Sequence, residues 1–118
     1  YYWSSYQNVI FRSTDRGITF NPSNTISGNS DAKGHIAVSP VEPDKVYFGS
    51  SNGVWKSTDQ GINFTFLSNP NSSCHGFAVS DINNDNILYG YVDAFASNDE
   101  GVSFVHITWW ANSNPDLT

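Results

Sequence analysis

Short apolar and aromatic runs alternate with polar turn residues along most of the chain. In its central part four such runs follow one another, each a few residues long and bounded by Gly, Pro, Asn, Asp or Ser. Runs of this length, rich in β-branched and aromatic residues, are typical of β-strands joined by tight turns. The predicted strands are His35 to Ser39, Lys45 to Gly49, Gly53 to Ser57 and Asn63 to Ser68. We therefore expect a sheet of four antiparallel strands in this region.

The same pattern occurs three times along the sequence. Octets that begin at Ser13, Ser57 and Ser97 share an Asp at the third position, a Gly at the fifth, an aliphatic residue at the sixth and a Phe at the eighth. The similarity continues outside the octets, where residues 46–49 (Val-Tyr-Phe-Gly) align with residues 87–90 (Ile-Leu-Tyr-Gly). A repeat of about 40 to 45 residues with four short strands has the size of a propeller blade.

The shared octet residues have a structural explanation. The Gly supplies the positive φ that a tight hairpin needs, and the Asp can accept hydrogen bonds from backbone amides freed by the turn. The Phe is expected to begin the fourth strand and to be buried. These structural residues are Ser13, Asp15, Gly17 and Phe20, then Ser57, Asp59, Gly61 and Phe64, then Ser97, Asp99, Gly101 and Phe104. Because each Asp has the same context in successive repeats, we interpret the acids as parts of turns and not as a catalytic or metal site.

The pattern Ser-x-Asp-x-Gly-x-Thr-aromatic resembles the Asp-box, or BNR repeat, of sialidases, xyloglucan-type glycoside hydrolases, sortilin-type receptors and secreted bacterial surface proteins. Thr19 keeps the family residue, whereas Asn63 and Ser103 replace it with other small hydrogen-bonding residues. The flanking segments are most similar to the secreted bacterial members. The resemblance implies an all-β chain of about two and a half to three four-stranded antiparallel blades of a larger β-propeller, with repeats at roughly 1–20, 34–68 and 75–108 in one segment.

A set of three blades predicts further partners for the outer sheets. Closed propellers have about 4 to 8 blades, so three would leave two sheet faces uncovered. We expect the rest of the propeller to come from the same chain or from other copies. The sequence has no Met, even at position 1, which we interpret as a processed chain or an internal fragment.

The charge balance narrows the classes of partner. Lys+Arg number 5 and Asp+Glu number 11, which gives a formal net charge of -6. This charge repels phosphate backbones and anionic lipids, and no segment approaches the roughly 20 consecutive apolar residues that span a bilayer. We expect neither nucleic acid binding nor membrane insertion. The resemblance implies a secreted or cell-surface location.

No metal or cofactor is expected. His35, His75 and His106 lack the spacing of metal ligands. The segment from Asp81 to Asn86 has alternating oxygen side chains like the start of a calcium loop, but in the repeat it aligns with an ordinary turn.

The resemblance also implies that the octet turns lie away from the ligand face. Loops of the other face hold the ligand-binding candidates Trp109, Trp110, Asp93 and Asp31. The two tryptophans could stack on sugar rings, or one could fill the core while the other covers a blade junction. The two acids could be solvated loop residues or members of a glycosidase pair. The catalytic residues, if any, stay unknown at this level.

Two hypotheses for function follow. The first is an extracellular or cell-surface recognition module that binds a glycan or an extracellular protein. The alternative is a glycoside hydrolase, xyloglucanase-like or sialidase-like, whose catalytic residues lie partly outside this segment. Binding needs only complementary shape and aromatic stacking, whereas hydrolysis needs a positioned acid pair, so the sequence favours recognition. A sialidase also needs three arginines, and this chain has only Arg12 and Arg16.

Overall fold

The chain is built from β-strands throughout the part that the structure describes. The computed structural model describes residues 2–4, 10–23, 34–70, 76–80, 86–90 and 94–107. The strands are β1 (Tyr2–Ser4), β2 (Ile10–Arg12), β3 (Asn21–Pro22), β4 (Gly34–Val38), β5 (Val46–Ser50), β6 (Gly53–Ser57), β7 (Thr65–Ser68), β8 (Gly76–Ser80), β9 (Asn86–Gly90), β10 (Ala94–Ser97) and β11 (Val105–Ile107). No helix occurs in these ranges, and so none of them provides a helix that could cross a membrane.

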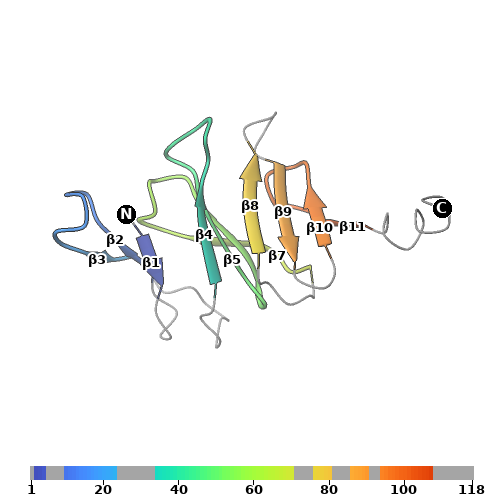
Figure 1. Ribbon diagram of the computed structural model, residues 1–118, viewed down its shortest axis with the longest axis horizontal. Helices are drawn as coiled ribbons and strands as arrows, with labels where there is room; N and C mark the ends of the chain where they lie inside the picture. Colours follow the sequence, from blue (N-terminus) through green and yellow to red (C-terminus); the bar gives the residue numbers. More distant parts are fainter. Residues whose placement is uncertain are drawn as a thin grey trace, which may run out of the picture.

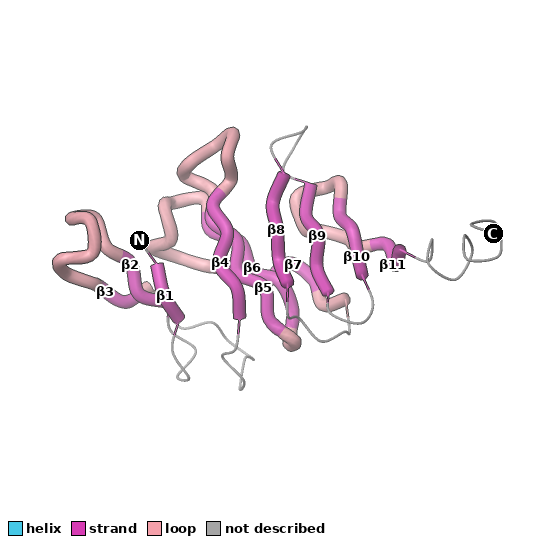
Figure 2. Tube along the Cα trace, viewed as in Figure 1, coloured by secondary structure: helices cyan, strands magenta, loops and turns pink. Residues whose placement is uncertain are grey.

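The strands form three antiparallel sheets in chain order. The first has the order β1-β2-β3, the second β4-β5-β6-β7 and the third β8-β9-β10-β11. In each sheet every strand pairs with its neighbour in the sequence, so short hairpins suffice for the connections. Figure 1 shows the three sheets one after another, with β4 beside β8, and Figure 2 shows that the described connections are loops.

The strand predictions for the second sheet are correct to within two residues. The prediction for β6 matches the observed strand, while β4 and β5 are displaced by one residue. The prediction that Asn63 and Phe64 begin the fourth strand is wrong, because β7 begins at Thr65 and both residues belong to the preceding octet. The same prediction is wrong for Phe20 and Phe104, which directly precede β3 and β11. Asn63 is held in this turn by its hydrogen bonds to Asp59, which compete with strand pairing.

Two apolar clusters join the sheets. Ile10 of the first sheet is buried against the second sheet. Its partners in that cluster are Val46, Phe48, Trp55 and Phe64, with Ile36 partly buried beside them. Val54 on the other face of the second sheet packs with Tyr89 of the third, and the flanking residues are Leu67, Phe77, Phe95 and Phe104. Because side chains alternate along a strand, the second sheet buries both of its faces.

The octet phenylalanines differ in burial. Phe64 is 4% exposed and belongs to the first cluster, as predicted, whereas Phe20 is 37% exposed. The expected burial of Phe20 is therefore wrong within the described part of the chain. Phe64 packs toward the sheet that precedes it, while Phe20 directly precedes β3 of the first sheet, and no earlier sheet exists among the described residues.

Candidate functional site

The octet turns are held by side-chain to backbone hydrogen bonds. In the second octet, Asp59 Oδ1 accepts a hydrogen bond from Ser57 Oγ at 2.6 Å and one from the Asn63 backbone N–H at 2.9 Å. Asn63 Nδ2 donates to Asp59 Oδ2 at 2.9 Å. Ser57 Oγ accepts from the Gly61 N–H at 2.9 Å. The Ser and the Asp together therefore satisfy the backbone groups that the turn leaves unpaired.

The other two octets repeat this arrangement. Thr19 and Ser103 donate through both backbone and side chain to Asp15 and Asp99, in the way that Asn63 donates to Asp59. Thr, Asn and Ser at the seventh position are equivalent because each supplies one short side-chain donor.

The same hydrogen bonds lower the pKa values of the three carboxyl groups. The side-chain hydrogen bonds from Thr19 and Ser103 are the largest causes for Asp15 and Asp99, and that from Ser57 is the largest for Asp59. Together with the further hydrogen bonds of each turn, they lower the pKa of each carboxyl group from 3.8 to about 2, because hydrogen bonds to the carboxylate stabilise the ionised form. A group with such a low pKa is poorly suited to act as a general acid at neutral pH.

The turn uses two left-handed residues in succession, of which the sequence predicted only the second. Gly61 has φ 81° and the preceding Gln60 has φ 60°. The same pair occurs as Arg16 with Gly17 and as Glu100 with Gly101. The fourth octet position is therefore a strained position that holds a different residue in each copy.

The opposite end of the sheets is built differently. Antiparallel neighbours reverse direction, so the turn between β5 and β6, at Ser51 and Asn52, lies at the end away from the octets. Here Tyr89 Oη donates a 2.6 Å hydrogen bond to the Ser50 carbonyl, which ties the third sheet to the second. Gly49 lies directly under the Phe77 ring, where an added Cβ would be 2.5 Å from Phe77 Cδ2. This end is therefore held by contacts between sheets.

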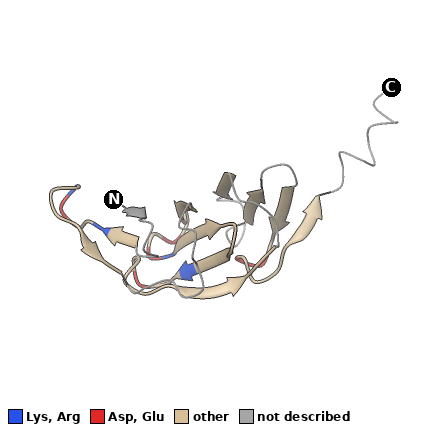
Figure 3. Ribbon diagram, turned by 90° about the horizontal axis from the view of Figure 1, so that it is seen from below, with Lys and Arg blue, Asp and Glu red and all other residues tan. Residues whose placement is uncertain are grey.

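Acidic residues are confined to the octet end in the part of the chain that the structure describes. They are Asp15, Glu42, Asp44, Asp59, Asp99 and Glu100, and all of them lie in turns (Figure 3). The described ranges place no carboxylate at the opposite end, and they contain no group of three or more metal-ligating side chains.

The ligand-binding candidates from the sequence all lie outside the described residues. These are Trp109, Trp110, Asp93 and Asp31. Asp93 falls in the connection between β9 and β10, and Asp31 falls in the connection that leads to β4. The described strand ends on either side of Asp93, Gly90 and Ala94, are at the end opposite to the octets. The proposed roles of these four residues stay predictions.

An ion cluster between the second and third sheets was missed by the sequence reasoning. Glu100 Oε1 lies 2.6 Å from Lys45 Nζ, and Glu100 Oε2 lies 2.8 Å from Lys56 Nζ. The hydrogen bond from Lys45 and then that from Lys56 lower the pKa of Glu100, and Glu100 is the largest cause that raises the pKa of Lys45. The available signal was the fourth octet position, which differs in charge among the three copies.

Comparisons with known proteins show the fold and help to choose between the two hypotheses for function. No family model matches the sequence. The chain is 39% identical over 74 residues to a xyloglucanase of Hypocrea jecorina (strain QM6a), a match that covers 56% of this chain and 9% of that protein. An ancestral GH74 enzyme has a solved structure similar to 90% of this chain, with a TM-score of 0.72, 19% sequence identity and 16% of its own length covered.

The expected fold class is confirmed by this likeness. The four-stranded antiparallel sheets are blades of a β-propeller, and they match a small portion of the much longer enzyme. The chain spans less than a fifth of the length of either relative. Of the two hypotheses for function, the relatives support the glycoside hydrolase better than the recognition module.

Proposed function

We propose that this chain is a segment of the β-propeller of a secreted glycoside hydrolase that cleaves a xyloglucan-type polysaccharide. The observation that carries the proposal is the 39% identity over 74 residues to a xyloglucanase. The fold of the ancestral GH74 enzyme supports the propeller framework. A glycan is then the partner, and the remaining blades complete the propeller.

The octet turns support the assignment of the repeats to the Asp-box type. Each turn has the same Ser–Asp–Gly hydrogen bonds despite Thr, Asn or Ser at the seventh position. In this assignment Asp15, Asp59 and Asp99 hold hairpins and take no part in hydrolysis. Their low pKa values agree with this role, because a general acid for glycoside cleavage needs a raised pKa.

The catalytic acids of the proposed hydrolase belong to the end opposite to the octets. Glycoside hydrolysis needs two carboxyl groups that flank the scissile bond. Asp93 and Asp31 are the acids of this segment that we assign to that end as candidates, and the other member of the catalytic pair can come from another blade. Trp109 and Trp110 are candidates for the aromatic surface on which sugar rings stack.

Hydrolysis and mere binding can be separated with the complete protein. It should be incubated with xyloglucan, an unbranched β-glucan and a sialoside, while bound polysaccharide and released reducing ends are both measured. The proposal expects reducing ends from xyloglucan and none from the sialoside. Binding of xyloglucan with no turnover would contradict the hydrolase and return the protein to the class of recognition modules.

Candidate residues can be tested in the same assay. Trp110→Ala should raise KM for xyloglucan because a stacking contact is lost. By analogy with other aromatic stacking contacts, the loss in binding free energy should be about 1 to 3 kcal/mol. Glu42→Gln is the matched control, because Glu42 is a 60% exposed acid at the octet end and its change should leave turnover and KM unaltered.

A further inference from the structure

The second octet contains a signal that the other two octets lack. Asn63, its seventh residue, is followed by Phe64 and then by Thr65, which gives the sequence Asn-x-Thr with x other than Pro. This sequence is the acceptor signal for N-linked glycosylation in secreted proteins. The same positions hold Thr-Phe-Asn in the first octet (residues 19–21) and Ser-Phe-Val in the third (residues 103–105), so neither of these forms the signal.

The two essential residues of this signal are on the surface. Asn63 and Thr65 are both exposed, while Phe64 between them is 4% exposed and packs into the cluster that joins the first and second sheets. The second sheet contacts a neighbouring sheet on each of its faces. Because both neighbours are present, the exposure of Asn63 and Thr65 does not result from an uncovered sheet.

The hydrogen bond that holds the Asn63 side chain is compatible with a sugar on its amide nitrogen. Asp59 Oδ2 lies 2.9 Å from Asn63 Nδ2, and a carboxylate can only accept, so the nitrogen of the amide faces it and not the oxygen. The nitrogen has two hydrogens, and one of them makes this bond. A sugar in place of the other hydrogen keeps the donor to Asp59, and the Asn63 backbone N–H still donates to Asp59 Oδ1.

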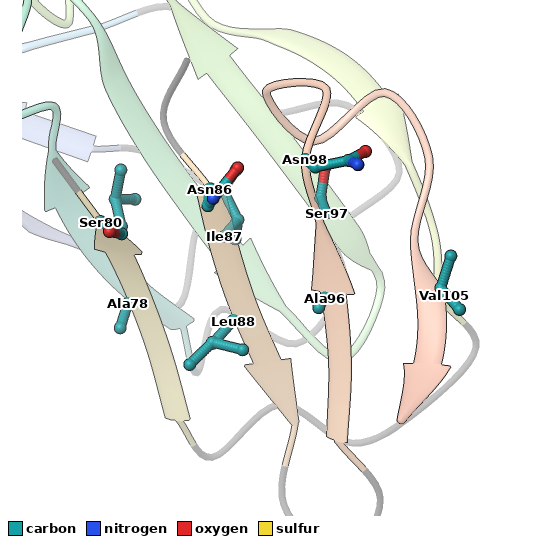
Figure 4. Close-up of a pocket in the computed structure, with 10 residues that line it drawn as sticks. Ala78, Ser80, Asn86, Ile87, Leu88, Ala96, Ser97, Asn98 and Val105 are labelled. Carbon is teal, nitrogen blue, oxygen red and sulfur yellow. The ribbon is translucent and has the colours of Figure 1, made fainter. Parts of the chain in front are cut away.

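The third sheet shows what takes the place of the Thr65 hydroxyl in a blade without the signal. Lys56 pairs with Thr65 across β6 and β7, and Ala96 pairs with Val105 across β10 and β11, so Val105 is the equivalent of Thr65 (Figure 4). Val105 is 71% exposed. A blade of this repeat therefore accepts an exposed valine here, and Thr65→Val removes the hydroxyl of the signal while it keeps a β-branched residue on the strand.

We propose that Asn63 is a site of N-linked glycosylation. The donor is an oligosaccharide joined through its first sugar to a lipid diphosphate. The bond between C1 of that sugar and the diphosphate oxygen breaks, a bond between C1 and Asn63 Nδ2 forms, and one hydrogen of Nδ2 leaves as a proton while the diphosphate keeps the electron pair of the broken bond. The proposal rests on the secretion that is part of the proposed function, through a eukaryotic secretory pathway, and not on hydrolysis.

Mass spectrometry of the secreted protein tests the site directly. The complete protein should be secreted from a eukaryotic host, with a glycoprotein of that host as the positive control. The background is Asn71→Gln, which removes a second signal at residues 71–73 that lies outside the described residues. We expect a glycan on Asn63 in most molecules, and an Asp at position 63 after a peptide N-glycosidase has removed it. Thr65→Val should abolish the modification, whereas Thr65→Ser keeps the hydroxyl and should retain it.

The matched control takes its residue from the third octet. Asn63→Ser removes the acceptor nitrogen and keeps the turn, because Ser103 donates to Asp99 as Asn63 donates to Asp59. This variant should lack the glycan and hydrolyse xyloglucan at the wild-type rate. An unmodified Asn63 in folded, secreted protein beside a glycosylated positive control overturns the proposal, and so does a glycan that persists in Thr65→Val. A glycosylated wild type without xyloglucan hydrolysis would contradict the proposed function alone.

Discussion

The two ends of the sheets use their residues in opposite ways. At the octet end, Asp15, Asp59 and Asp99 each close a turn within a few residues of their own position. At the other end, the described contacts join different sheets, such as Tyr89 with the Ser50 carbonyl. The Ser–Asp–Gly turns of the octet end are therefore specified locally and repeat with the sequence, although the fourth and fifth octet positions of the third copy also contact another sheet. The opposite end depends on how the blades stack and is free to vary between blades. An Asp in an octet therefore serves to hold a turn, and this role does not carry over to an Asp at the opposite end.

The largest effect should come from protonating the three turn carboxylates together. Their folded-state pKa values of about 2 are below the ordinary 3.8, so their stabilisation is fully present above that value and is lost as the pH falls toward 2. Urea unfolding midpoints measured from pH 7 to pH 2 should decline mainly below about pH 4. A variant with all three residues changed to Asn should lose much of this decline, and equal slopes for both proteins would show that the turns are not held by ionised groups.

The next largest effect is expected at Gly101, where the octet end meets the neighbouring blade. Gly101→Ala introduces a side chain at φ 86° and 3.1 Å from Leu67 Cδ1 of the second sheet, so it should cost about 2 to 4 kcal/mol in the free energy of unfolding. Gly17→Ala is the matched control, with φ 87° at an exposed position, and should cost only about 1 to 2 kcal/mol. Equal losses from denaturant unfolding would mean that contact between blades adds nothing at this turn.

A smaller effect should follow from the contact at the opposite end. Tyr89→Phe keeps the buried ring and removes the hydrogen bond to the Ser50 carbonyl, which should lower the free energy of unfolding by about 1 kcal/mol. The loss should be independent of pH between 4 and 7, unlike the loss at the octets. A change in the acid limb of the stability profile would contradict the separation of the two ends.

The local nature of the octets explains why the sequence predicts them well. Gly61 and Asp59 carry their own turn signal, and the alternation in residues 53–57 is enough to give β6 its observed bounds. The strand was predicted two residues too early at Asn63 because a side-chain hydrogen bond competes with pairing. Burial of Phe20 was predicted wrongly because it depends on a neighbouring sheet and not on the octet itself.

Contacts between blades could not be predicted from local patterns. The cluster of Glu100 with Lys45 and Lys56 joins residues far apart in the sequence, and its position holds Arg16 and Gln60 in the other octets. Only the stacking of one sheet on another brings these charges together. The ligand-binding candidates have the same limitation, since loop positions such as Asp93 follow no repeat and lie outside the described residues.

The most direct test of the division between the two ends compares one acid from each. In the complete protein, hydrolysis of xyloglucan and the thermal midpoint should be measured for Asp59→Asn and for Asp93→Asn and Asp31→Asn. Asp59→Asn should lower the midpoint while the folded protein keeps its kcat, because the carboxylate only holds a turn. At least one of the other two substitutions should abolish turnover with an unchanged midpoint. Full turnover in both of them, or loss of kcat in folded Asp59→Asn, would contradict this division of roles.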